Sequence, residues 1–408
     1  MHLTGIRKQF LVRSGRPRGK LDYIMPGKAP KIFSTVISMT FTLGGMVFSG
    51  CSEQNASEPS AAKKLSEFDL STNAFEVCKT KEAEKEIFLK FFSKQGYKIP
   101  GNPSEDALNA FFEDLREGYF QETEGLDHSI IQKKYHTFTH ALDVMITTHS
   151  LLQAGAGIFL KEEEKGILLL AALAHDALHT GVNNSFLAKI NHPLVKKFGE
   201  SSVQEKHSFQ FMNEILGKHG IIENRDANIP NRYFQFIQES ILWTDFARHK
   251  ELVAEIGKLV PKVESLLHGK RKLNGLSQTG NPATMDLQTG LDLSSDFNSS
   301  ERLLLASFIL HCADVSNPGK EWPVCKKWAN LIMSEFFGQG DLEKSLSMLP
   351  SMNCDRETVS IAECQIGFGQ FVIKDLFKNL EKISGDGGIW LSKNLKINQA
   401  NWQAVLQK

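Results

Sequence analysis

The chain has 408 residues, of which 41 % are hydrophobic, so it is long enough for a substantial buried core and for roughly two or three domains. Lys and Arg together number 47, as do Asp and Glu, and the net charge of zero gives no electrostatic basis for a nucleic-acid partner. The five Cys other than Cys51 lack the CxxC spacing of a cysteine zinc site and are an odd number for disulfides. These observations indicate a globular protein whose chemistry uses other residue types.

Residues 1–51 differ from the rest of the chain. A basic stretch precedes an uncharged apolar run over 32–48, which is less hydrophobic than a membrane span of roughly 20 residues but is typical of a signal-peptide core. The run ends in FSGC, and small residues directly before Cys51 resemble the cleavage site of bacterial lipoproteins, where that Cys is lipidated. A simple membrane anchor and an uncleaved signal are the alternatives, and initiation at Met25 would give a leader of ordinary length. The leader predicts an exported or membrane-associated protein.

Residues 52–72 are predicted to form a flexible tether, because 52–64 is rich in Ser, Ala, Glu and Pro. From 73 to 408 apolar residues recur at helical spacing and convincing strand alternation is absent, which predicts an all-α domain. The predicted helices lie near 81–92, 106–120, 137–154, 162–179, 201–219, 231–243, 248–267, 301–313, 321–338 and 356–380. The polar stretch 268–300 is predicted to be a surface loop insertion, since so long a loop is uncommon inside a compact domain.

The stretch 168–184, LLLAALAHDALHTGVNN, places polar residues at the end of an apolar run. His175 and His179 are four residues apart and would share one face of a helix, with Asp176 beside them and Gly181 ending the helix. A buried charge is costly unless it is compensated, and a metal ion would compensate Asp176. The alternative is a core helix whose last turn happens to be polar.

Two further stretches repeat this pattern. Upstream, His136 and His140 are four residues apart near the start of a predicted helix, and downstream Asp314 ends a strongly apolar helix. The candidate metal ligands, from three separate helices, are His140, His175, Asp176 and Asp314. Imidazole and carboxylate ligands suit Zn²⁺, Mn²⁺ or Fe²⁺, and Asp176 could bridge to a second cation such as Mg²⁺ or Mn²⁺. Two such cations about 3.5 to 4 Å apart are typical of hydrolytic phosphoryl chemistry.

Four segments, in order, resemble the class I 3′,5′-cyclic nucleotide phosphodiesterases over 111–380. They are YHTFTHALDV, HDALHTGVNN, HCADVSNP and CQIGF. The resemblance implies that the four candidate ligands hold zinc at a first site, with Mg²⁺ or Mn²⁺ at a second site touched by Asp176. It also implies that His136 is the general acid that protonates the departing O3′. A carboxylate would keep His136 protonated, and Glu363 or another acid could serve.

The same resemblance assigns further residues to the site. His179 and Glu205 join His136 in the catalytic set, and with Asn184 and His207 they match the polar shell around the metal waters. Lys206 and Ser208 depart from the family pattern and put the detail of that shell in doubt. The residues that match the purine pocket are Gln365, which would hydrogen-bond the base, Phe368 and Ile332, which would clamp its faces, and Asn317. Asp245 resembles a further family segment and has a helix cap as its alternative interpretation.

The resemblance therefore implies hydrolysis of 3′,5′-cyclic nucleotides to 5′-monophosphates. Cyclic AMP is favoured as the substrate, with cyclic GMP as a second one if the amide of Gln365 rotates. Two alternatives remain: another HD-type phosphohydrolase acting on a different nucleotide, and a non-hydrolytic domain that senses cyclic nucleotides. The sequence carries no prediction of the oligomeric state.

Overall fold

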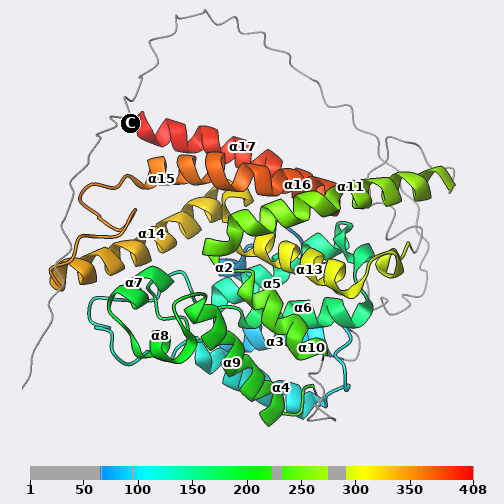
Figure 1. The fold of residues 1–408 in the computed structure, drawn as a ribbon, viewed down its shortest axis with the longest axis horizontal. Coiled ribbons are helices and arrows are strands. Elements are labelled where there is room, and N and C mark those ends of the chain that lie inside the picture. The colour runs from blue at the N-terminus through cyan, green and yellow to red at the C-terminus, as the bar shows by residue number, and fades with distance from the viewer. Residues whose placement is uncertain (1–64, 66, 94–95, 223–231, 274–290, 408) are drawn as a thin grey trace, which may run out of the picture. The chain divides into compact units, whose positions relative to one another are not determined.

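The computed structural model describes residue 65 and residues 67–93, 96–222, 232–273 and 291–407 (Figure 1). Its first half contains α2 (Ala74–Val77), α3 (Lys81–Phe92), α4 (Glu105–Gly118), α5 (Phe138–Gln153), η1 (Ala156–Phe159), α6 (Glu162–Ala174), α7 (Asn184–Lys189), α8 (Pro193–Phe198), α9 (Val203–Lys218) and α10 (Arg232–Leu242). Its second half contains η2 (Phe246–Arg248), α11 (His249–Leu273), η3 (Ser294–Asp296), α13 (Ser299–Asp314), η4 (Asn317–Gly319), α14 (Trp322–Ser345), α15 (Ile361–Phe368), η5 (Gly369–Ile373), α16 (Lys374–Ser384) and α17 (Asp386–Leu406). No strand occurs in these ranges, so the all-α prediction is confirmed.

Helix α6 lies at the centre of the main hydrophobic core. Every residue from Gly166 to Ala174 is buried, and the helix contacts α5, α9, α10 and α13. A helix that is apolar on all sides must be enclosed by others, which explains why the run LLLAALA carries no polar face. The end of α6 is therefore deep inside the molecule, and the polar residues that follow it emerge into its interior.

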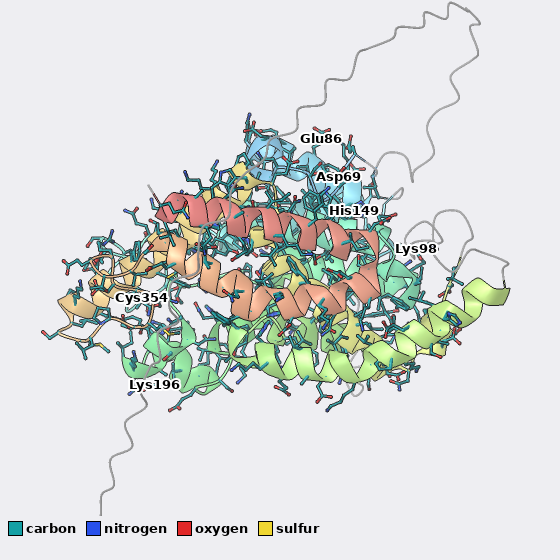
Figure 2. All side chains as sticks on the ribbon, turned by 90° about the horizontal axis from the view of Figure 1, so that it is seen from above. Asp69, Glu86, Lys98, His149, Lys196 and Cys354 are labelled. Carbon is teal, nitrogen blue, oxygen red and sulfur yellow. The ribbon has the colours of Figure 1, made fainter. Side chains whose placement is uncertain are left out.

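Helix α17 was not predicted, and the predicted helix 356–380 proves to be three elements. It consists of α15, the π-helical segment η5 and α16, and α17 then runs alongside α16 (Figures 1 and 2). A π-helical segment inserts extra residues into the helical repeat and is frequent next to functional sites. Here it begins directly after Phe368, one of the predicted purine-binding residues.

Two predicted boundaries were wrong within the part of the chain that is described. Helix α11 continues to Leu273, and Leu293 and Phe297 are buried in the main core, so a loop over the whole of 268–300 is excluded. At the other end, Phe68 and Leu70 of the predicted tether 52–72 are also buried in that core. Both boundaries were misplaced because a few apolar side chains that pack into the core stand within otherwise polar sequence.

The predictions for the leader fall outside the described residues. This holds for the lipoprotein-like site at Cys51 and for most of the tether. Among the helices that the structure describes, none is both long and apolar enough to span a bilayer. Of the five Cys in the described ranges, all are free thiols and four are buried, in line with the absence of a disulfide framework.

Candidate active site

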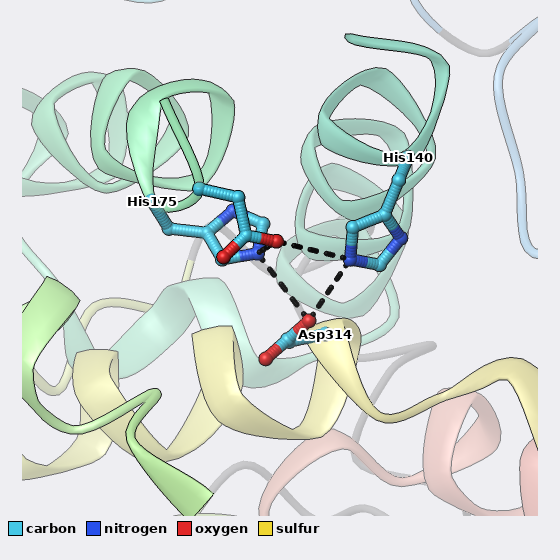
Figure 3. A group of neighbouring side chains, drawn as sticks. His140, His175 and Asp314 are labelled. Atoms are coloured by element: carbon cyan, nitrogen blue, oxygen red, sulfur yellow. Dashed lines mark hydrogen bonds and ion pairs between the residues drawn. The ribbon is translucent and has the colours of Figure 1, made fainter. Parts of the chain in front are cut away.

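The four predicted metal ligands lie together although they come from three parts of the fold. His140 is in the first turn of α5, His175 and Asp176 directly follow α6, and Asp314 ends α13 (Figure 3). Asp314 Oδ1 is 3.1 Å from His140 Nε2 and 3.3 Å from His175 Nε2. Asp176 Oδ2 is 3.0 Å from His175 Nε2 and 3.6 Å from His140 Nε2. One ligand atom from each residue lies within 4.8 Å of all the others, which is the arrangement of a cation site.

The orientation and charge of these side chains fit a divalent cation. The Nδ1–H of His175 donates to the carbonyl of Ala172 at 2.8 Å, which turns Nε2 toward the carboxylates of Asp176 and Asp314. Burial would raise the pKa of Asp314, but His175 and His140 hold that pKa below its ordinary value. Two imidazoles and two ionised carboxylates form a donor set that suits zinc and leaves coordination positions open.

The predicted path of the chain through 175–181 was wrong. Helix α6 ends at Ala174, and Leu178 adopts a positive φ of 61°, which breaks the helical path between His175 and His179. Gly181 does not end the helix but lies in the following loop, with a φ of 81° and Ile131 close to the position of a Cβ. The two His side chains therefore do not share a helical face, and His179 points to a different neighbour.

That neighbour is His136. The two rings stack with centroids 3.6 Å apart and planes inclined by 20°. Nδ1 of His136 also forms an ion pair with Glu335 on α14, whose Oε2 accepts from the backbone N–H groups of Lys134 and Tyr135 at 3.0 and 2.9 Å. Burial lowers the pKa of His136, but Glu335 and the nearby Asp176 outweigh it and raise that pKa to about 9. His136 is therefore protonated at neutral pH.

The suggestion of Glu363 as the acidic partner of His136 was wrong. Glu363 lies in the first turn of α15, where its N–H donates to Ser360, whereas the carboxylate that pairs with His136 belongs to Glu335. The sequence did contain a signal for Glu335. It follows Trp328 and Ile332 at helical spacing, and a carboxylate on such an apolar stripe is buried only if something compensates its charge.

The shell residues divide into two groups. Glu205 accepts from Asn184 at 2.9 Å and lines the same cavity as the cation site. Burial, with help from the nearby Asp245, raises the pKa of Glu205 to about 7. His207, in contrast, does not line the cavity, and its ring contacts Phe198 at a centroid distance of 5.8 Å. The match of His207 to the shell is therefore not supported by its position.

The three other residues whose role the sequence left open form hydrogen bonds within the protein. Asp245 caps η2 by accepting from the N–H of Ala247 at 2.9 Å, as the cap interpretation expected, although it also lines the cavity. Lys206 donates to the backbone carbonyls of Phe198 and Ser201. The hydroxyl of Ser208 donates to the backbone carbonyl of Ala177 at 2.7 Å. Lys206 thus contacts the end of α8, and Ser208 contacts the turn after α6. Neither of these two departures from the family pattern lies in the four-residue cation cluster.

A cavity of about 990 Å³ joins the cation cluster to the predicted purine pocket. It is lined by the predicted residues His136, Asp176, His179, Glu205, Asp314, Asn317, Ile332, Gln365 and Phe368, while His140 and His175 are buried beneath its floor. Its size lies at the upper end of the range typical of small-molecule sites. The structure therefore brings all eleven predicted site residues to one place.

Sequence reasoning missed several aromatic side chains of this cavity, among them Phe246, Trp328 and Phe336. Phe246, in η2, lines it with its ring centroid 6.0 Å from that of Phe368. Asn317 is oriented by a hydrogen bond from its side-chain Nδ2 to the hydroxyl of Tyr135. Phe246 sits in a three-residue helix between longer elements, where helical periodicity gives no indication of which way a side chain points.

Comparison with known proteins identifies the family of this chain. A family model described as 3′5′-cyclic nucleotide phosphodiesterase matches residues 135–391, which is more than half of the chain. The chain belongs to this family. The matched region contains the cation cluster, the His136–Glu335 pair and the residues predicted to bind the purine.

Individual relatives show the same likeness. A 3′,5′-cyclic-AMP phosphodiesterase of Drosophila melanogaster, isoform F, is 30 % identical over 69 % of this chain and 39 % of its own. A dual specificity calcium/calmodulin-dependent 3′,5′-cyclic nucleotide phosphodiesterase of the same organism is 30 % identical over 71 % of this chain and 30 % of its own. The chain thus spans less than half the length of these curated relatives.

A solved structure shares the fold. The phosphodiesterase domain of the rhodopsin phosphodiesterase of Salpingoeca rosetta matches with a TM-score of 0.65 and 25 % identity, over 86 % of this chain and 95 % of that one. The expected resemblance to class I 3′,5′-cyclic nucleotide phosphodiesterases is therefore confirmed at the level of sequence family and of fold.

Proposed function

We propose that the chain hydrolyses 3′,5′-cyclic nucleotides to 5′-nucleoside monophosphates, with cyclic AMP preferred over cyclic GMP. The observation that carries this proposal is the single cavity that has the cation cluster and His136 at one end and Gln365 and Phe368 at the other. A cyclic phosphate at the charged end and a purine at the amide and aromatic end would fill it. The preference for cyclic AMP rests on the relatives, one named for cyclic AMP and another for dual specificity.

The proposed reaction uses two divalent cations. His140, His175, Asp176 and Asp314 would hold zinc, and Asp176, with the hydrogen-bonding groups of Glu205 and Asn184 nearby, would contact Mg²⁺ or Mn²⁺ at a second site. When bound, these cations lower the pKa of a water molecule and neutralise charge on the phosphate oxygens. His136, kept protonated by Glu335, donates its proton to O3′ as the P–O3′ bond breaks.

The purine would be bound by groups of two kinds. Gln365 offers both an amide donor and a carbonyl acceptor, which match the hydrogen-bonding edge of either purine when the amide is turned. Phe368 on α15 and Ile332 on α14 both line the cavity and would contact the two faces of the base. Aromatic stacking is worth about 1 to 3 kcal/mol per base and discriminates little between adenine and guanine.

A steady-state comparison of the two cyclic nucleotides tests this function. The purified full chain, with Zn²⁺ and either Mg²⁺ or Mn²⁺, is expected to release the 5′-monophosphate from both, with the higher kcat/KM for cyclic AMP. Chelation of the cations should remove the activity, because the proposed site has no other source of Lewis acidity. Absence of hydrolysis with every cation would refute the proposal, and a higher kcat/KM for cyclic GMP would reverse the assigned preference.

We also propose that the leader brings the protein to a membrane through a lipid on Cys51. This proposal rests on the basic stretch, the apolar run 32–48 and the small residues before Cys51. In bacterial cells fed a labelled lipid precursor, the wild-type chain is expected to carry label and to sediment with membranes. Cys51→Ala should remove the label while leaving the enzyme activity of lysates unchanged. Equal labelling of the two chains would exclude Cys51 as the lipid site.

A further inference from the structure

Gln204 is buried at the start of α9 and uses the whole hydrogen-bonding capacity of its amide. Oε1 accepts from the N–H of Thr180 at 2.9 Å and from its hydroxyl at 2.6 Å. Nε2 lies 2.8 Å from the carbonyl of Val182, to which it donates, and 3.0 Å from Nε2 of His179. An amide has two acceptor and two donor positions, and the amide of Gln204 uses all four. If this amide flipped, it would lose its hydrogen bonds to the loop after α6.

These contacts fix the direction of the second N–H of Gln204. Because Thr180 and Val182 hold the amide in one orientation, that N–H points at the ring of His179. The amide nitrogen of Gln204 faces Nε2 of His179, and the backbone N–H of Gly181 faces Nδ1 of the same ring at 3.1 Å, so both ring nitrogens are in contact with groups of fixed position. The ring is therefore held at an edge by a side chain that is itself immobile.

The face of the same ring lies against His136, at the centroid distance of 3.6 Å given above. Glu335 contacts the ring of His136 at one nitrogen, Nδ1, and the stacked ring of His179 limits rotation of the His136 ring about that contact. A contact series thus runs from Gln204 through His179 to His136. Misplacement of a catalytic group by about 1 Å can cost a hundredfold in rate, so such a series has a measurable effect.

We propose that Gln204 is a positioning residue for the reaction: it fixes the ring of His179, against which the general acid His136 stacks. The inference rests on the proposed function, since it assumes that His136 donates the proton. Gln204 lines the cavity, but its amide is turned toward the loop 179–182 and its role does not require contact with substrate.

Three single variants separate the two ends of the amide. Gln204→Met keeps the length of the side chain and removes all four bonds, and is expected to lower kcat by roughly tenfold to a hundredfold with KM changed less than about threefold. Gln204→Glu keeps acceptors for Thr180 and loses the donor to His179, so its kcat should fall by as much as that of Gln204→Met. Thr180→Val removes one of the four bonds of Gln204, together with two 3.4 Å contacts between Thr180 and Val182 within the loop, and its kcat should stay within about threefold of wild type.

A double-mutant cycle with His136→Ala decides between positioning and a general structural role. If Gln204 acts through His136, Gln204→Met should reduce the residual rate of His136→Ala by less than about twofold. An equal reduction in both backgrounds, including one caused by partial unfolding, would overturn the inference. So would a Gln204→Glu variant with wild-type kcat. Failure of the proposed function is distinct, because the wild-type chain would then hydrolyse no cyclic nucleotide.

Discussion

Replacing Asp314 with alanine is expected to reduce the hydrolysis of cyclic AMP and cyclic GMP by about a thousandfold or more, which corresponds to about 4 kcal/mol of transition-state stabilisation. Asp314 Oδ1 lies 3.1 Å from His140 Nε2 and 3.3 Å from His175 Nε2, so its loss opens one side of the cation cluster. Two buried imidazoles and Asp176 would remain, and with one charged ligand fewer the site should hold zinc less tightly. Zinc retained after dialysis should fall together with kcat/KM.

The fold should survive this change. Asp314 is the last residue of α13, whose preceding residues are buried in the core, and the alanine removes a carboxylate that is costly to bury without a cation. Asp375→Ala, an exposed carboxylate on α16, is the matched control and should leave both activity and zinc content unchanged. Wild-type activity in folded Asp314→Ala would refute the assignment of Asp314 as a ligand, because a ligand cannot be dispensable for a metal-dependent rate.

His136→Ala is expected to slow turnover by roughly a hundredfold or more while the zinc content stays at the wild-type level. The loss is the usual contribution of a general acid, and His136 is not a member of the four-residue cation cluster. The measurement combines kcat from steady-state kinetics with zinc analysis of the same preparation. Unchanged turnover would remove His136 from the mechanism, and loss of zinc would instead make it part of the metal site.

Glu335→Gln tests how His136 holds its proton. Glu335 raises the pKa of His136, so in the wild type the imidazolium persists as pH rises and is lost only near pH 9. Removing the carboxylate lowers that pKa, and His136 then loses its proton at a lower pH. The alkaline limb of the kcat/KM profile should therefore move toward neutral pH, with activity best preserved at the acidic end. An alkaline limb at the wild-type position would show that Glu335 does not control this proton.

The helices and the cation ligands could be predicted because they depend on local pattern. An apolar run that stops at His175 and Asp176, and another that stops at Asp314, place polar groups at buried helix ends, where a compensating charge is required. The spacing of apolar residues also predicted α5, α9, α10 and α13 to within a few residues. Local pattern failed at α17, at the π-helical segment after Phe368 and between His175 and His179, where the chain departs from simple helical repeat.

The partners of the active-site groups depend on contacts between distant residues. Glu335 and Glu363 are both acidic residues on predicted helical segments, and only the contact of α14 with the loop before α5 selects Glu335 as the partner of His136. Likewise Gln204 meets His179 because α9 packs beside the end of α6.

The sequence by itself determined that the protein is helical, which residues could hold a cation, and which family it resembles. These properties follow from periodicity, from the cost of burying unpaired charge, and from short motifs whose residues are close along the chain. Only the tertiary structure decided that His136 pairs with Glu335, that His179 stacks on it, and that one cavity joins the cation cluster to Gln365 and Phe368. Those relations join helices far apart in sequence, and their geometry is set by side-chain packing, which has no period that can be read along the chain.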